Sequence, residues 1–171
     1  HELSWQDAGY WQAITRISDA YLMLITSTLS VYYLPKLSAL VTKSEIRLEI
    51  KKAYFRVMPV VALMALFVFI FKKHIILILF SPEFMSMQPL FLFQLLGDIF
   101  KIASWLLGFV MLAKGLMKVF IFSEVFFSLS YCVLSVIFVK LLGLPGVAIA
   151  FACNYFMYWV FMVGYFKRFL R

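Results

Sequence analysis

Residues Pro89 to Ala113 read PLFLFQLLGDIFKIASWLLGFVMLA, an apolar run long enough to cross a lipid bilayer as one α-helix. About 20 predominantly apolar residues suffice, because hydrocarbon roughly 30 Å thick is crossed at about 1.5 Å per residue. The whole chain shares this character: of 171 residues, 65% are hydrophobic and 14% charged, and the mean hydropathy is +0.98. A water-soluble domain is roughly half apolar and a quarter charged. The sequence therefore predicts an all-α, polytopic membrane helix bundle.

Outward from this segment, further stretches meet the same length requirement, and about five spans are expected in all. We place them at residues 11–34, 53–71, 89–113, 119–142 and 146–166, within one helical lobe that covers residues 1–171. Chain-breaking residues separate the spans: Pro35, Ser81 with Pro82, Lys114 with Gly115, and Gly143 to Gly146. Residues 35–52 are predicted to form a loop. Residues 75–80 are too short to cross alone, and we interpret them as an interfacial or re-entrant piece.

Basic residues collect on one predicted side of the membrane. That side holds eleven of them, which are Lys36, Lys43, Arg47, Lys51, Lys52, Arg56, Lys114, Lys118, Lys167, Arg168 and Arg171. The other side holds Lys72, Lys73 and Lys140. Because short loops rich in Lys and Arg stay cytoplasmic, the basic loop and the C-terminus are predicted to be cytoplasmic. The surplus of 16 basic over 8 acidic residues is thus a topology signal, with added attraction to membrane lipids, and nucleic acid is not expected as a partner.

Within the basic loop, residues 45–54 alternate charged and apolar side chains at a spacing that suits a helix. This pattern fits a helix lying along the membrane surface. A solvated linker would carry the same composition, and the sequence leaves both interpretations open.

Apart from Arg56 and Lys140 near span ends, five charged residues fall inside predicted spans, where charge is costly and normally faces a bundle interior or an aqueous cavity. They are Arg16, Asp19, Asp98, Lys101 and Glu124. At steps of three and four, Gln12, Thr26 and Ser30 join the first two on one helix face, and Gln94 joins Asp98 and Lys101 on another. The span at 53–71 has no such stripe and should face lipid. Two stripes that cross the whole membrane favour a water-lined path with these residues along it.

Simpler interpretations of the same residues remain open. Arg16 with Asp19, and Asp98 with Lys101, are opposite charges three apart on one helix, so each pair can neutralise itself locally. Small residues such as Gly97 can serve close helix packing. Glu124 lies near the cytoplasmic end of its span and can extend to the interface.

Signatures of catalysis are missing from the sequence. It contains no glycine-rich phosphate loop, no HExxH and no CxxC, and one of its two His residues is His1. The two cysteines, Cys132 and Cys153, sit in apolar runs, where they act as small hydrophobic residues. We therefore expect no enzyme activity, no catalytic residues, no metal and no cofactor.

Three sequence motifs carry a family resemblance. They are ISDAYLMLITSTLSVYYLPKLSAL (Ile17–Leu40), FQLLGDIFKIASWLLGFVMLAKG (Phe93–Gly115) and SEVF from Ser123. Together they resemble the C-terminal half of the lipid III and O-antigen flippases, bacterial transporters of the MOP superfamily that are related to the MATE exporters. The resemblance runs from Trp5 to about Tyr165 and fades over the last two spans.

This resemblance implies a transporter of about twelve helices in two lobes around a charged cavity. Such proteins flip an undecaprenyl-diphosphate-linked oligosaccharide across the bacterial inner membrane by alternating access, for surface polysaccharides such as O-antigen or enterobacterial common antigen. The chain would supply helices eight to twelve, with the N-terminal lobe of the same transporter as its partner. Its start at His1 without methionine and its odd number of spans lead us to expect a fragment of a roughly 400-residue protein, inactive alone.

The resemblance also implies roles for individual residues. Asp19, Asp98 and Lys101 match SDAY and GDxxK-like motifs of the family, whereas Arg16 stands where relatives carry a small polar residue. Lys101 and Arg16 would attract the diphosphate, and the two aspartates would hold these cations or exchange protons or sodium. Two alternatives remain: half of a MATE-like exporter of cationic drugs, or a membrane scaffold subunit that transports nothing.

Overall fold

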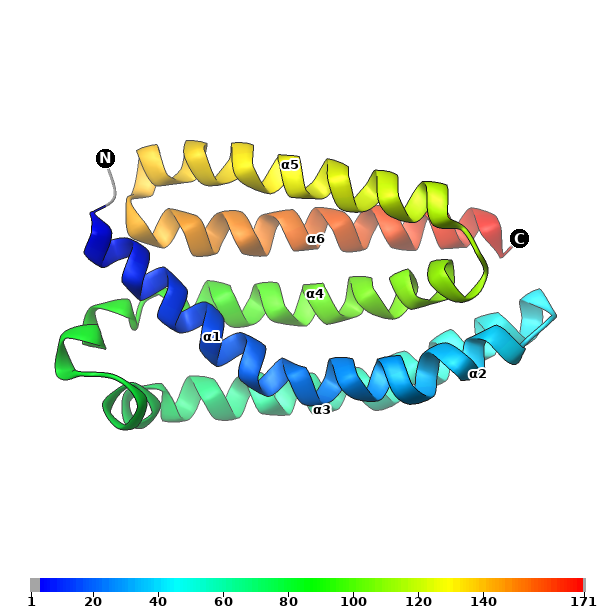
Figure 1. The fold of residues 1–171 in the computed structure, drawn as a ribbon, viewed down its shortest axis with the longest axis horizontal. Coiled ribbons are helices and arrows are strands. Elements are labelled where there is room, and N and C mark those ends of the chain that lie inside the picture. Colours follow the sequence, from blue (N-terminus) through cyan, green and yellow to red (C-terminus); the bar gives the residue numbers. More distant parts are fainter. Residues whose placement is uncertain (1–3, 171) are drawn as a thin grey trace.

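The structure is a computed structural model that describes residues 4–170, and within this range it contains helices and no strands. Arg171, one of the basic residues predicted to be cytoplasmic, and residues 1–3 of the predicted lobe lie outside the described residues. Figure 1 shows the helices, which in order are α1 (Trp5–Thr28), a π-helical segment (Leu29–Tyr33), α2 (Leu34–Ala39), α3 (Lys43–Leu79), a 3₁₀ segment (Pro82–Met87), α4 (Leu90–Ala113), α5 (Met117–Leu142) and α6 (Leu144–Phe169). The predicted all-α bundle is confirmed.

Four helices, α3 to α6, are long and apolar enough to cross a membrane. The first predicted span is also helical, but Gln12, Arg16 and Asp19 make α1 too polar to join this group. Pro35 does not break the chain as predicted, because it falls in the first turn of α2, where no N–H is needed. The π-helical segment lies directly before it, and there the Leu34 N–H bonds to the Leu29 carbonyl five residues back.

Helix α3 departs most from the sequence prediction. The predicted loop at 35–52 is largely helical, since Thr42 and Glu45 form a capping box that starts α3 at Lys43. Residues 75–80 are no separate piece, because α3 continues to Leu79. Its 37 residues span about 55 Å at 1.5 Å per residue, so the basic first turns extend beyond the hydrocarbon. The helix at residues 45–54 is therefore collinear with the span and does not lie along the membrane surface.

Helix α4 is the central element of the bundle and packs against α6, α3 and α1. Gly97 permits the close approach to α6, because a Cβ there would overlap the Phe151 ring. This supports the packing interpretation of that glycine. At the turns on either side of α5, Gly115 and Gly143 adopt φ of +67° and +68°, a conformation that glycine accepts without strain.

The basic segments gather at one end of the bundle. Figure 1 places the α2–α3 connection, the α4–α5 turn and the C-terminus together, and the α3 end and the α5–α6 turn at the opposite end. Contacts join the basic end: the Lys36 ammonium pairs with Glu49 at 2.7 Å, and the Lys114 ammonium donates to the Leu40 carbonyl. The grouping of basic segments used for the charge count is thus reproduced in the fold.

Candidate functional site

A buried carboxyl group lies where α1 meets α4. Asp98 has no exposed surface and accepts hydrogen bonds from the Tyr21 hydroxyl at 2.7 Å and from the Gln94 amide at 3.2 Å. The same amide nitrogen donates to the Ser18 hydroxyl at 3.1 Å. Within the described residues, the Gln94 amide oxygen is buried without a partner. Polar groups from two helices thus converge on one carboxyl group inside an otherwise apolar region.

Next to this carboxyl group, Lys101 and Asp19 form an ion pair between α4 and α1. Their charged atoms are 3.7 Å apart, and the Lys101 ammonium also lies 5.3 Å from the centre of the Trp105 ring. The Lys101 side chain is 17% exposed and the Asp19 side chain 63%, so the pair lies at the edge between the bundle interior and its surroundings. We call Ser18, Asp19, Tyr21, Gln94, Asp98 and Lys101 the α1–α4 polar cluster.

The two local ion pairs considered from the sequence do not form. Between residues 4 and 170 the structure contains two ion pairs, Lys36 with Glu49 and Lys101 with Asp19. Arg16 and Asp19 therefore do not neutralise each other, and Asp98 is held by uncharged donors. Each of the two ion pairs joins two different helices.

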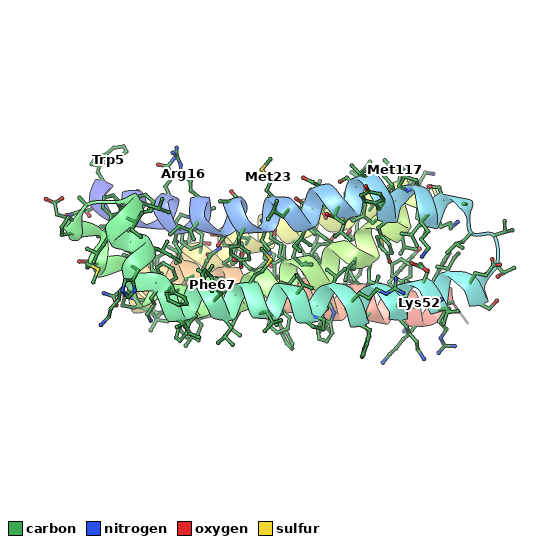
Figure 2. All side chains as sticks on the ribbon, turned by 90° about the horizontal axis from the view of Figure 1, so that it is seen from below. Trp5, Arg16, Met23, Lys52, Phe67 and Met117 are labelled. Atoms are coloured by element: carbon green, nitrogen blue, oxygen red, sulfur yellow. The ribbon has the colours of Figure 1, made fainter. Side chains whose placement is uncertain are left out.

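Other predicted site residues lie on the outer face of α1 and of the π-helical segment that continues it. Gln12, Arg16 and Ser30 are exposed, and Figure 2 shows Arg16 pointing away from the bundle. Thr26 is half-buried, and its hydroxyl donates to the Met23 carbonyl of its own helix at 3.2 Å. The structure does not bring these residues to Asp98. Beside the α1–α4 polar cluster they form a row that we call the polar stripe of α1. Two exposed apolar residues, Met23 and Leu24, interrupt this row.

Glu124 belongs to a second polar region, between α5 and α6. It accepts a hydrogen bond from the Tyr158 hydroxyl at 2.6 Å, so its carboxylate faces α6 and does not extend to the interface. A cavity of about 110 Å³ opens beside it, and Asn154 lies in its wall. The buried side-chain amide oxygen of Asn154 has no partner among the described residues. Because a water molecule occupies about 30 Å³ of liquid, this space can hold a few waters.

Sequence reasoning missed two members of the α1–α4 polar cluster, Ser18 and Tyr21. Both lie in the ISDAY motif that carried the family resemblance, so the signal for them was present in the sequence. Tyr54 was also missed. Its hydroxyl donates to the Ala103 carbonyl and accepts from the Trp159 indole at 3.3 Å, which ties α3 to α4 and α6.

The chemistry available at the α1–α4 polar cluster is binding and proton exchange. An ammonium can hold an anionic group, the carboxyl groups can exchange protons, and the amide and hydroxyl groups can hydrogen-bond to a polar ligand. Within residues 4–170, no three His, Cys, Asp or Glu side chains lie close enough together to hold a metal ion.

Comparison with known proteins gives a consistent result. The chain is similar to the Lipid III flippases of Escherichia coli (strain K12) and Shigella flexneri, each 35% identical over 174 aligned residues that include 99% of this chain. This chain is a homologue of lipid III flippases. It spans 41% of the length of these two relatives. No protein-family model and no solved structure matches it.

The resemblance that the motifs indicated is therefore confirmed, as is the chain's multi-pass membrane character. Both relatives are flippases and not enzymes, which agrees at a coarse level with the expectation of no enzyme activity.

Proposed function

We propose that this chain is the C-terminal lobe of a transporter that flips an undecaprenyl-diphosphate-linked oligosaccharide across the bacterial inner membrane by alternating access. Similarity to two Lipid III flippases over 99% of the chain carries the proposal. The chain spans 41% of their length, and the N-terminal lobe of the same transporter would supply the opposite wall of the path. The basic end and the C-terminus face the cytoplasm, in keeping with the charge asymmetry.

In this proposal Asp19 and Lys101, the accessible charged members of the α1–α4 polar cluster, line the transport path together with the polar stripe of α1. Lys101 attracts the diphosphate, and Asp19 holds its ammonium when no substrate is bound. Their separation of 3.7 Å and the exposure of Asp19 leave the pair accessible from one side, so an incoming phosphate can compete for the ammonium. Arg16, on the outer face of α1 three residues before Asp19, supplies a second cation.

The remaining site residues serve the sugar portion and the water that accompanies it. Amide, hydroxyl and carboxylate groups are offered to a polar ligand by Gln12, Thr26, Ser30 and Glu124. Gln94 is buried, and it supports the wall of the path through its hydrogen bonds to Ser18 and Asp98. Asp98 positions Gln94 and Tyr21 through the hydrogen bonds described above. The polyprenyl tail stays in lipid beside the opening between the lobes, since it needs no polar partner.

The test is transport by the complete protein in proteoliposomes, measured with a fluorescent lipid-linked oligosaccharide whose outer-leaflet fraction is bleached. Lys101→Gln should abolish flipping, whereas Lys118→Gln, an exposed lysine at the start of α5, should leave it near the unsubstituted rate. Normal flipping by Lys101→Gln would remove the proposed role of the ammonium. Export of a cationic drug without flipping would replace the proposal with the MATE-like function, and transport of neither compound with an intact fold would favour the scaffold.

Ion coupling is proposed on the two intramembrane aspartates. Asp19→Asn and Asp98→Asn should each slow flipping and remove its dependence on a proton or sodium gradient. If both variants transport at normal rates that do not respond to pH or sodium, the coupling role is wrong.

A further inference from the structure

An exposed strip of α3 changes from basic to apolar along its length. Lys43, Arg47 and Lys51 follow one another at intervals of four residues, and Phe55, Pro59 and Ala62 continue the row. Residues three or four apart are neighbours on a helix surface, so these side chains form one strip, and all of them are exposed. The strip winds around α3, because each step of four residues turns by about 40°. Figure 2 labels Lys52 near the basic end of α3 and Phe67 farther along the same helix.

The basic part of the strip borders an open hollow of about 310 Å³, and Leu170, directly after α6, also lines it. Lys43, Arg47 and Lys51 line it, and the two ion pairs found within residues 4–170 lie elsewhere. The carboxylates on the same helix are already engaged, since Glu45 accepts from the Thr42 backbone N–H at 3.0 Å and Glu49 pairs with Lys36. Three cations therefore share a hollow into which no carboxylate of the described residues projects.

The apolar part of the strip borders a second hollow, of about 660 Å³, between α3 and α4. Its walls include Phe55, Met58 and Ala62 from α3 and Ile99 from α4. Lys51 lines both hollows, so they adjoin at this residue. Because α3 extends beyond the hydrocarbon at its basic end, the first hollow falls at the level of the headgroups and the second at the level of the acyl chains.

We propose that the two adjoining hollows form a binding site for an anionic glycerophospholipid. Its phosphate lies among Lys43, Arg47 and Lys51, and one acyl chain runs along the groove past Phe55 and Ala62. Charge complementarity favours an acidic headgroup, because basic residues at a membrane surface attract anionic lipids. The apolar groove selects a lipid over free phosphate, which has nothing to place there. The site does not depend on the proposed transport function, because it lies on α3, outside the α1–α4 polar cluster.

The first test compares two sets of charge removals in the full chain, reconstituted in nanodiscs of phosphatidylethanolamine with phosphatidylglycerol. Bound lipid is counted by native mass spectrometry after release into detergent. The triple variant Lys43→Gln, Arg47→Gln, Lys51→Gln should retain about tenfold less phosphatidylglycerol. The control triple Lys52→Gln, Arg56→Gln, Lys167→Gln removes the same charge from nearby exposed positions outside both hollows and should lose less than about twofold. Equal losses would mean diffuse attraction and overturn the site.

The second test fills the groove and leaves all charges in place. Ala62→Phe projects a ring into the apolar hollow from an exposed position, so the helix should fold normally. Phosphatidylglycerol retention should fall several-fold, while retention of phosphatidylethanolamine should not change. Full retention by Ala62→Phe would overturn the acyl part of the site. Displacement of the lipid by millimolar inorganic phosphate would show an anion site without a lipid and would also overturn the proposal.

Discussion

Replacement of Tyr21 by phenylalanine should weaken the contact between α1 and α4, because it removes the hydroxyl that donates to buried Asp98 at 2.7 Å. Hydrogen bonds to charged groups in proteins contribute about 1.5 to 3 kcal/mol. Those measured inside membranes average about 0.6 kcal/mol and reach about 1.7, since the unfolded state in the membrane also finds partners. The short distance and complete burial favour the upper part of the membrane range, so we expect a loss of about 1 to 1.5 kcal/mol in unfolding free energy.

The assay is reversible unfolding in mixed micelles, with a double-mutant cycle that pairs Tyr21→Phe with Asp98→Leu. Tyr32→Phe is the matched control, because Tyr32 is 74% exposed. If the hydroxyl acts through Asp98, Tyr21→Phe should cost little once the carboxyl group is absent, and the coupling energy should be about 1 kcal/mol. A coupling near zero, or an equal loss for Tyr32→Phe, would refute the contact.

Three other changes follow from the structure. Gly146→Ala should lower the unfolding free energy by about 1 to 3 kcal/mol, because its Cβ would overlap the Phe138 backbone carbonyl, whereas Gly164→Ala, in open space, should not. Asn154→Leu should raise stability in the same unfolding assay, because it removes a buried side-chain amide oxygen without a protein partner. A loss of stability would contradict this and show that water in the adjoining cavity satisfies the oxygen. The Thr42 N–H and hydroxyl, with the Val41 N–H, lower the pKa of Glu45. A lowered pKa in the folded state means that the Glu45 carboxylate stabilises the start of α3 above the ordinary glutamate pKa range. This stabilisation is lost as pH falls through the folded pKa. Protection of the amides in the first turn of α3 against hydrogen exchange, measured relative to the intrinsic exchange rate at each pH, should therefore fall in acid, and Glu45→Gln should remove this dependence.

Much of the helical architecture follows from composition and length, because a bilayer demands long apolar helices and these are visible as runs in the sequence. The turns at Gly115 and Gly143 were also predictable, because each apolar run ends at a glycine, a residue that accepts positive φ. The extent of α3 was not predicted from hydropathy. Hydropathy reports where a chain is apolar, whereas the capping box at Thr42 and Glu45 determines where this helix starts.

At the candidate site, periodicity identified the charged residues but not their partners. The spacing of Asp98 and Lys101 suggested a pair within one helix, yet helix packing places Lys101 against Asp19 and Asp98 against Tyr21. Sequence spacing describes neighbours on a single helix, and contacts between helices depend on rotation and register. The inward direction of Glu124 has the same origin, because Tyr158 comes from a different helix.

The central claim is that the polar face of α1 lines a water-filled path used by a lipid-linked oligosaccharide. Thiol accessibility in the complete transporter tests it directly, after Cys132 and Cys153 are replaced by alanine. Ser27→Cys, at an exposed position of α1 next to Thr26 of the polar stripe, should react with a membrane-impermeant maleimide and be protected by the lipid-linked oligosaccharide. Leu63→Cys, on the exposed apolar face of α3, should not react. An unreactive Ser27→Cys, or reaction that the substrate does not slow, would contradict the account.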